Sequence, residues 1–263
     1  MRLYWELAVR GFQRTVIYRS AAVSAVITNS FFGFIFCYVF IALYETRAEA
    51  GGYTLADALT FVFVTQAMIG LVEMWAWWRI AETVQSGQVA TDLSRPLDFQ
   101  LYWLAQDYGR AVCQLLVRSV PTLLVGMVAF GVRLPPDLAH WLALGPSLLF
   151  AVTISFAWRF CLNLTTFWWT DHRGVASISG LAAMLLAGFV VPLAMLPDAV
   201  RTPIYLMPLA SMIAIPVDVF LGKLSDGRLI AALLLQGFWA RAALGVGRLV
   251  LAAALRKLVV QGG

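Results

Sequence analysis

The chain has 263 residues, of which 61% are apolar and only 13% are charged, and its mean hydropathy is +0.81. Soluble domains are about 45–50% apolar and about 25% charged, so a soluble domain of this composition would lack the polar side chains that cover a water-facing surface. The composition therefore excludes soluble proteins and predicts an integral membrane protein.

The charge balance points in the same direction. Lysine and arginine number 19 against 14 aspartates and glutamates, which gives a net charge of +5. In a membrane protein such an excess marks the cytoplasmic loops, and we expect no nucleic-acid partner. The three cysteines lie far apart in apolar stretches, which indicates small buried side chains and not a disulfide framework or a metal site. They are Cys37, Cys113 and Cys161.

The first segment, residues 1–19, has the pattern of an amphipathic helix. Trp5, Val9 and Phe12 recur at helical spacing beside a polar stripe that contains Arg10. Such a helix would lie in the cytoplasmic membrane interface with its arginines on lipid phosphates. The alternative is an ordinary basic flank that only sets the topology.

Six apolar stretches follow, each close to the length of about 20 residues that a helix needs to cross a bilayer. We therefore expect an all-α membrane protein in which residues 20–263 form one transmembrane domain of six helices. The expected spans are residues 20–44, 58–78, 111–132, 141–169, 177–196 and 229–251.

The second connection, residues 79–110, is too long for a tight turn between two helices. Gly87 can end a helix, and Pro96 disfavours helix at Arg95 before it. These breaks predict two short helices folded over the cytoplasmic mouth of the protein. The alternative is a plain long loop.

Residues 188–228 contain five of the ten prolines of the chain. The apolar runs between these prolines are too short to span a membrane and too apolar for an open extracellular loop. Short broken helices that dip back into the outer leaflet satisfy both facts, because irregular backbone at that depth must be buried in protein or line a cavity. The segment is a candidate outer gate, and the alternative is a compact lid that does not gate.

The distribution of lysine and arginine predicts the orientation of the chain. The N-terminal arm, the second and fourth connections and the tail carry ten of these residues, against five in the connections on the other side. Because cytoplasmic loops carry the excess, both termini are predicted to be cytoplasmic.

Four ionisable residues fall within the expected spans, where an unpaired charge costs a few kcal/mol. Glu73 and Arg118 both lie roughly 10 Å below the cytoplasmic surface at 1.5 Å per residue, and we expect them to pair. Arg159 has no evident acidic partner, so it shares Glu73 or faces a wet cavity. Arg241 can reach the cytoplasm if the last span ends near Gly247. Ion pairing between helices is favoured over a substrate path or a proton role.

Sequence motifs of catalysis are missing. The chain has no phosphate-binding Gly-x-x-x-x-Gly-Lys-Ser/Thr loop, no Gly-x-Ser-x-Gly and no His-Glu-x-x-His. Its two histidines, His140 and His172, fall at opposite membrane faces in the expected topology, which argues against a shared metal site. We therefore expect no catalytic residue, metal or cofactor in this chain.

The order of these pieces resembles the membrane subunit of ABC exporters of the second permease class, the ABC-2 family. Within that class it resembles the half-size bacterial permeases that are often encoded in pairs beside one ATPase. The matching pieces are Tyr18-Arg19, Ser86-Gly87, Leu93-Ser94-Arg95-Pro96-Leu97, Phe167-Trp168-Trp169-Thr170-Asp171, Gly188 to Leu193, Leu196-Pro197, Met207-Pro208-Leu209, Pro216, Phe220-Leu221-Gly222, Gln236, Trp239 and Val260-Gln261-Gly262-Gly263.

The resemblance implies that a separate nucleotide-binding subunit hydrolyses ATP with Mg²⁺, and that a second copy or a sister permease completes the path. It also implies a multi-pass exporter of the bacterial cytoplasmic (inner) membrane for hydrophobic or cationic drugs, antibiotics or lipid-like molecules. Carried onto this chain, the ATPase-coupling residues are Glu82, Ser86, Gly87, Asp92, Arg95, Pro96 and Leu97, and the outer-gate residues are Gly188, Pro192, Pro197, Pro208, Pro216 and Gly222.

Two other classes stay open from the residues alone. One is a stand-alone secondary transporter or intramembrane enzyme, although no matching pair of three-span halves is evident. The other is a membrane scaffold or sensor. The substrate also stays open, because aromatic residues such as Trp75, Trp77 and Trp78 can stack on a cationic drug or form an interfacial belt.

Overall fold

The fold is given by a computed structural model that describes residues 2–73, 78–169 and 173–257. In these ranges every regular element is a helix, apart from an isolated bridge between Ala50 and Tyr53. Parts of three expected features lie outside the described residues: the end of the second span with Trp75 and Trp77, the turn after the fourth span at 170–172, and the C-terminal motif at 260–263.

Five continuous helices are long and apolar enough to cross a membrane within the described residues. They are α2 (Arg19–Tyr44), α3 (Leu55–Val72), the run of α6 (Phe99–Gln114), η1 (Leu115–Ser119) and α7 (Val120–Phe130), α8 (Leu138–Leu164), and α12 (Asp226–Leu255).

The fifth expected span, 177–196, is not such a helix. The helix in this region, α9 (Arg173–Leu186), has 14 residues and is therefore about 21 Å long, which is short for a hydrocarbon core of about 30 Å. It ends because Gly188 takes a positive φ of 73° and turns the chain. The six-span layout is therefore not confirmed, although the all-helical membrane fold is.

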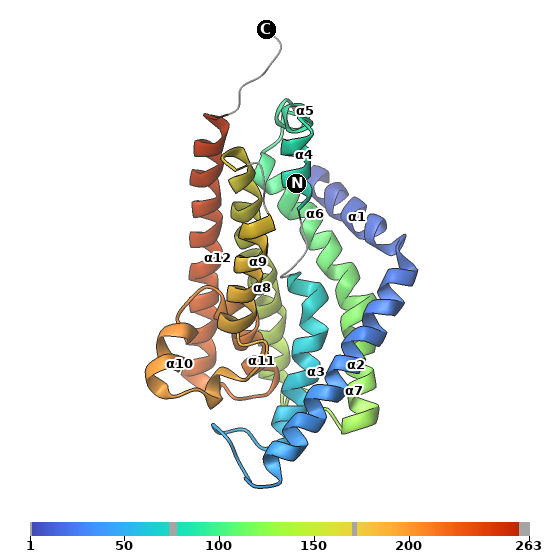
Figure 1. The fold of residues 1–263 in the computed structure, drawn as a ribbon, viewed down its shortest axis with the longest axis vertical. Coiled ribbons are helices and arrows are strands. Elements are labelled where there is room, and N and C mark those ends of the chain that lie inside the picture. Colours follow the sequence, from blue (N-terminus) through green and yellow to red (C-terminus); the bar gives the residue numbers. More distant parts are fainter. Residues whose placement is uncertain (1, 74–77, 170–172, 258–263) are drawn as a thin grey trace.

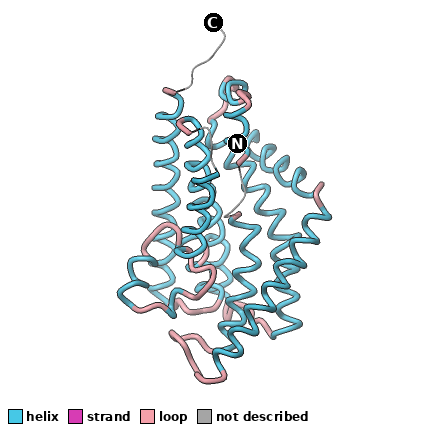
Figure 2. Tube along the Cα trace, viewed as in Figure 1, coloured by secondary structure: helices cyan, strands magenta, loops and turns pink. Residues whose placement is uncertain are grey.

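The helices run between two ends of the molecule (Figure 1). At one end lie α1 (Arg2–Val16), α4 (Arg79–Gln85), α5 (Val89–Leu93) and the C-terminal end of α12. The loop after α2 lies at the opposite end, and α10 (Asp198–Tyr205) and α11 (Ala214–Phe220) are displaced toward it. Figure 2 shows that the connections between helices gather toward these two ends.

The centre of the core is α3, most of whose residues are buried. Its Phe63 side chain is fully buried and lies against Gly126 of α7, where an added Cβ would overlap the ring. Phe130 contacts the rings of both Phe63 and Phe34, with centroid distances of 5.7 and 4.9 Å. Close packing at Gly126 thus brings α2, α3 and α7 together around one aromatic cluster.

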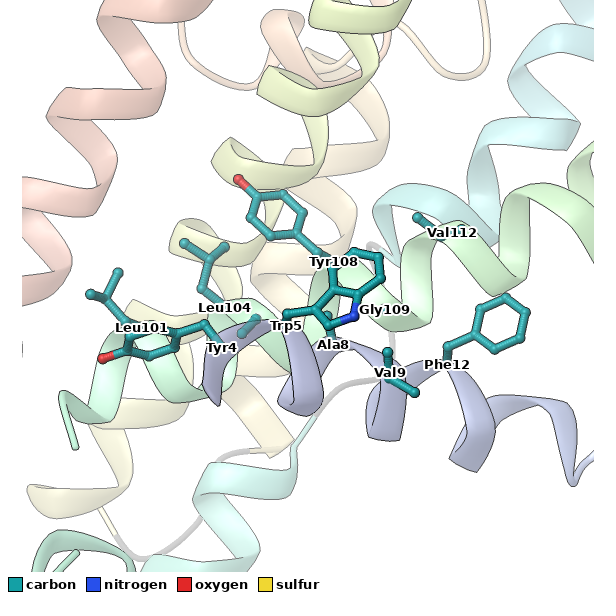
Figure 3. Close-up of a pocket in the computed structure, with 11 residues that line it drawn as sticks. Tyr4, Trp5, Ala8, Val9, Phe12, Leu101, Leu104, Tyr108, Gly109 and Val112 are labelled. Atoms are coloured by element: carbon teal, nitrogen blue, oxygen red, sulfur yellow. The ribbon is translucent and has the colours of Figure 1, made fainter. Parts of the chain in front are cut away.

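The expected N-terminal helix is confirmed as α1, which packs along α6. A Cβ on Gly109 of α6 would overlap the backbone of Ala8, and one on Gly11 of α1 would overlap that of Gln106. Glycine is needed at both places because the backbones approach so closely. Beside this contact, apolar side chains of the two helices, with Trp5 among them, line a pocket of about 630 Å³ (Figure 3).

Candidate functional site

Four charged side chains meet in the protein interior near the end of α3. Asp107 lies between two arginines, with its Oδ1 2.7 Å from Arg110 Nε and its Oδ2 2.8 Å from Arg159 Nη2. The carboxylate of Glu73 lies 2.9 Å from Arg110 Nε and 3.6 Å from Arg159 Nη1. We call Glu73, Asp107, Arg110 and Arg159 the charge network. Its two negative and two positive charges sum to zero.

The same network ends α3. Arg110 donates hydrogen bonds to the carbonyl oxygens of Gly70 and Leu71, at 2.6 and 3.0 Å, and Ser155 of α8 donates one to the carbonyl of Val72. The last carbonyls of a helix have no partner within it and carry a partial negative charge. A buried guanidinium at this position satisfies the carbonyls and stabilises the helix dipole.

The network corrects the expected pairing of Glu73 with Arg118. Arg118 donates instead to the Asn29 side chain, at 3.0 Å, and Glu73 pairs with Arg110. The expectation failed because the third span was predicted to begin at residue 111, whereas its helix begins at Phe99 and places Arg110 inside the fold. The expectation that Arg159 shares Glu73 is confirmed, but its closest carboxylate, Asp107, was missed.

Arg241 lies apart from the network, exposed and halfway along α12. The expectation that it reaches the cytoplasmic surface required the helix to end near Gly247. Instead α12 continues to Leu255, so about 21 Å of helix separates Arg241 from that end. The condition of that expectation is therefore not met, because the side chain cannot reach the end of the helix.

The 79–110 connection contains the two short helices that its sequence predicts. Gly87, with φ +74°, separates α4 from α5, and the Asp98 side chain caps the start of α6 at Leu101 N. The inner faces of both short helices are buried, at Ile80 and Val89 among others.

A side-chain hydrogen bond connects α4 with the charge network. The backbone N–H of Ala81 donates to Asn163 Oδ1 of α8 at 3.0 Å, and Asn163 Nδ2 donates to the carbonyl of Arg159 at 2.8 Å. The residues expected to contact an ATPase are on the outside of this region. Exposed among them are Glu82, Ser86, Gly87, Arg95 and Pro96, while Asp92 and Leu97 are half-buried.

The 188–228 segment consists of short helices, as its prolines predict. Besides α10 and α11 it contains the single turns η3 (Leu193–Met195) and η4 (Ala210–Met212). Pro192 and Pro197 directly precede η3 and α10, and Pro216 lies in the first turn of α11. Pro208 lies between α10 and η4, and Gly188 and Gly222 both have positive φ.

A half-buried carboxylate, Asp218 of α11, holds this segment to the rest of the protein. It accepts hydrogen bonds from the hydroxyls of Tyr53, at 2.6 Å, and of Tyr205, at 3.1 Å. Burial raises the pKa of Asp218 to about 6 and raises the pKa of both tyrosines. Nearby, Lys223 Nζ lies 2.7 Å from Asp57 at the start of α3.

Neither the hydrogen bonds to Asp218 nor the Lys223–Asp57 pair was found from the sequence. Tyr53 and Asp218 are 165 residues apart along the chain, and nothing in the local pattern of either residue indicates the other. The available signal was the single aspartate within the apolar run 209–221. As for metal ions, no group of three or more His, Cys, Asp or Glu side chains within the described parts of the chain is arranged to hold one.

The fold and its buried charges define a polytopic α-helical membrane protein. The comparison with protein families matches residues 27–262 to the family described as ABC-2 family transporter protein. Because the match covers most of the chain, the chain belongs to the ABC-2 family and is a membrane permease component of an ABC transporter, a transporter part that is not itself catalytic. No curated protein matches the sequence.

Proposed function

We propose that the chain is the permease half of an ATP-driven exporter, with ATP and Mg²⁺ bound by a separate ATPase subunit that docks onto the 79–110 connection. The observation that carries this proposal is the two-sided construction of α4. Its Ile80 side is buried in the core and bonded to α8, while Glu82 and Ser86 face outward. A force applied to the exposed side therefore has a rigid route into the membrane helices.

The route continues through the charge network to the far end. Asn163 connects α4 with the backbone of Arg159, and the network clamps one end of α3. The other end of α3 carries Asp57, which pairs with Lys223 of the 188–228 segment. On the proposed mechanism, closure of the motor moves α4 and α8, α3 transmits the motion, and the Asp57–Lys223 contact opens the outer gate. The gate residues are those around Gly188, Pro192, Pro197, Pro208, Pro216 and Gly222.

A second permease chain, either a copy or a sister, completes the path. Arg241 supports this part of the proposal, because a charge at the middle of a span costs at least about 2.5–3.5 kcal/mol when it faces lipid. The exposed charge of Arg241 on α12 would be stabilised by a water-filled path or by a partner chain.

We place the assembly in the bacterial inner membrane with both termini cytoplasmic. The proposed substrates are hydrophobic or cationic drugs, antibiotics or lipid-like molecules.

Cysteine crosslinking tests the docking surface directly. In a chain whose three native cysteines are replaced by alanine, single cysteines at Glu82, Ser86 and Arg95 are expected to crosslink to a co-purified ATPase subunit. A cysteine at Arg133, at the opposite end of the helices, is the matched control and is expected to give no crosslink. Absence of crosslinks at all three positions would contradict the docking proposal.

Purification from native membranes tests the assembly. Recovery of an ATPase subunit and of ATPase activity is expected, and mass spectrometry of the product shows whether one or two kinds of permease are present. Recovery of this chain without an ATPase under several mild detergents would contradict the proposal.

A further inference from the structure

A polar cavity of about 450 Å³ is lined by residues from the bend between α1 and α2, from α4 and from η1. Four arginines and two glutamates line it. Arg110 and Glu73 already belong to the charge network. Three further arginines, Arg14, Arg79 and Arg118, face one further carboxylate, Glu82, so the cavity carries an excess of positive charge.

One arginine of this cavity, Arg118, is incompletely partnered. The Nε–H of Arg118 is a buried donor and has no hydrogen-bond partner. Burial first, and then the neighbouring charge of Arg14, lower the pKa of Arg79. Buried donors without partners and unbalanced like charges both cost free energy, and an anion in the cavity would remove both costs.

The backbone is shaped to place Arg118 there. It lies in η1, a turn of π-helix within the third span. Such turns are rare in proteins, and those that occur are often found at functional sites. Opposite it, Gly70 of α3 leaves the space that the arginine occupies, since an added Cβ would lie 2.8 Å from Arg118 Cδ. The cavity is therefore formed by the fold and is not a gap at a loose surface.

An apolar groove of about 390 Å³ continues from the polar cavity. The two share Thr15, Ala22 and Val117, and the groove runs on along α2 past Val26 and toward Pro121 of α7. A cationic chamber joined to an apolar groove at the membrane surface matches one kind of ligand in both charge and polarity. That ligand is an amphiphile with an anionic head and an alkyl chain.

We propose that this cavity and groove bind one anionic phospholipid from the leaflet beside α1. The phosphate group lies among Arg14, Arg79 and Arg118, and an acyl chain lies in the groove between α2 and α7. The bound lipid ties the bend between α1 and α2 to the start of the 79–110 connection. The site lies beside the proposed docking surface, since Glu82 belongs to both, and lipid binding is measured on this chain without the ATPase or the transported substrate.

Native mass spectrometry of the full chain in detergent tests the site with phosphatidylglycerol and phosphatidylcholine of matched acyl chains. One phosphatidylglycerol is expected to bind about tenfold more tightly than phosphatidylcholine, because the extra negative charge meets the arginine excess. The double variant Arg79→Gln, Arg118→Gln is expected to lose that preference. Arg133→Gln, an exposed arginine at the other end of the helices, is the matched control and is expected to keep it.

Two further variants keep the test decisive if the double variant fails to fold. Arg118→Lys preserves the charge and is expected to retain the preference. Val26→Trp fills the groove and is expected to weaken binding of long-chain phosphatidylglycerol but not of its dihexanoyl form.

Equal binding of phosphatidylglycerol and phosphatidylcholine, or no difference between the double variant and Arg133→Gln, would overturn the proposal. Displacement of the lipid by excess inorganic phosphate would instead assign the cavity to a soluble anion.

Discussion

Asp107 is a buried carboxyl group and Asp218 a half-buried one, and the protein surrounds them with different partners. Asp107 lies between the guanidinium groups of Arg110 and Arg159. Asp218 accepts hydrogen bonds from two tyrosine hydroxyls, and the nearby cation, Lys223, pairs with Asp57 instead. The negative charge of Asp107 is therefore compensated by two positive charges, whereas the carboxyl group of Asp218 is stabilised by two neutral hydroxyl donors.

This difference indicates different mechanical roles for the two ends of α3. A buried ion pair is costly to break, because separation leaves uncompensated charges, so the charge network is suited to a fixed joint. Neutral hydrogen bonds are individually weaker, and a carboxyl group with a pKa of about 6 can lose or gain a proton near physiological pH. The 188–228 segment is therefore held by the contact that is easier to release.

The largest expected effect comes from removing the central charge of the network. Asp107→Asn would leave Arg110 and Arg159 with Glu73 alone, and we expect a loss of stability of about 3–5 kcal/mol. Asp198→Asn removes an exposed partner of Arg201 and is expected to cost about 0–1 kcal/mol. Thermal unfolding in detergent measures both. Similar melting temperatures for the two variants would contradict the role of the network.

The geometry of Arg110 gives the next largest effect. Arg110→Lys keeps the charge but cannot contact Asp107, Glu73 and two backbone carbonyls together, because an ammonium group lacks the planar fork. We expect a loss of about 1.5–3 kcal/mol, the usual value for hydrogen bonds to charged groups. The control is Arg248→Lys, whose arginine makes one exposed ion pair. An equal tolerance of both lysines in thermal unfolding would show that charge alone suffices.

The pH dependence of the outer contact follows from Asp218. Its folded pKa, about 6, is raised from the ordinary value of 3.8 for aspartate. The contribution of Asp218 to stability is therefore full below the unfolded pKa and is lost as the pH rises through about 6. The melting temperature of the wild type relative to Asp218→Asn is therefore expected to be higher at a pH of about 5 than at a pH of about 7.5. Parallel pH curves for the two proteins would contradict this assignment.

The smallest expected effect concerns the bond between α4 and α8. Asn163→Ala removes the acceptor for the Ala81 N–H, and we expect a cost of about 1 kcal/mol and faster hydrogen exchange in α4. Thr165→Ala is the control, because that hydroxyl bonds only within its own turn, to the carbonyl of Leu162. Equal exchange in both variants would show that the packing of Ile80, and not this hydrogen bond, holds α4.

Periodicity and composition were sufficient wherever a structure depends on neighbours along the chain. The limits of the first span, the two short helices around Gly87 and the breaks at Pro192 and Pro197 are all local effects, since apolar runs, glycine conformation and proline geometry act over a few residues. For the same reason the membrane class and the lack of a phosphate loop were readable from the sequence alone.

Tertiary structure alone decided which charges meet. Arg110 was predicted to lie in a loop and Arg118 to pair with Glu73. The third helix instead begins at Phe99, about three turns earlier than predicted, and together with the π-helical turn at η1 this earlier start exchanged the roles of the two arginines. Asp218 and Tyr53 meet only because α11 folds back against the loop before α3. The sequence determined which charged residues fall within the membrane region and that they need partners, because each unpaired charge is costly there. Their partners depended on the packing of distant helices, which no local pattern encodes.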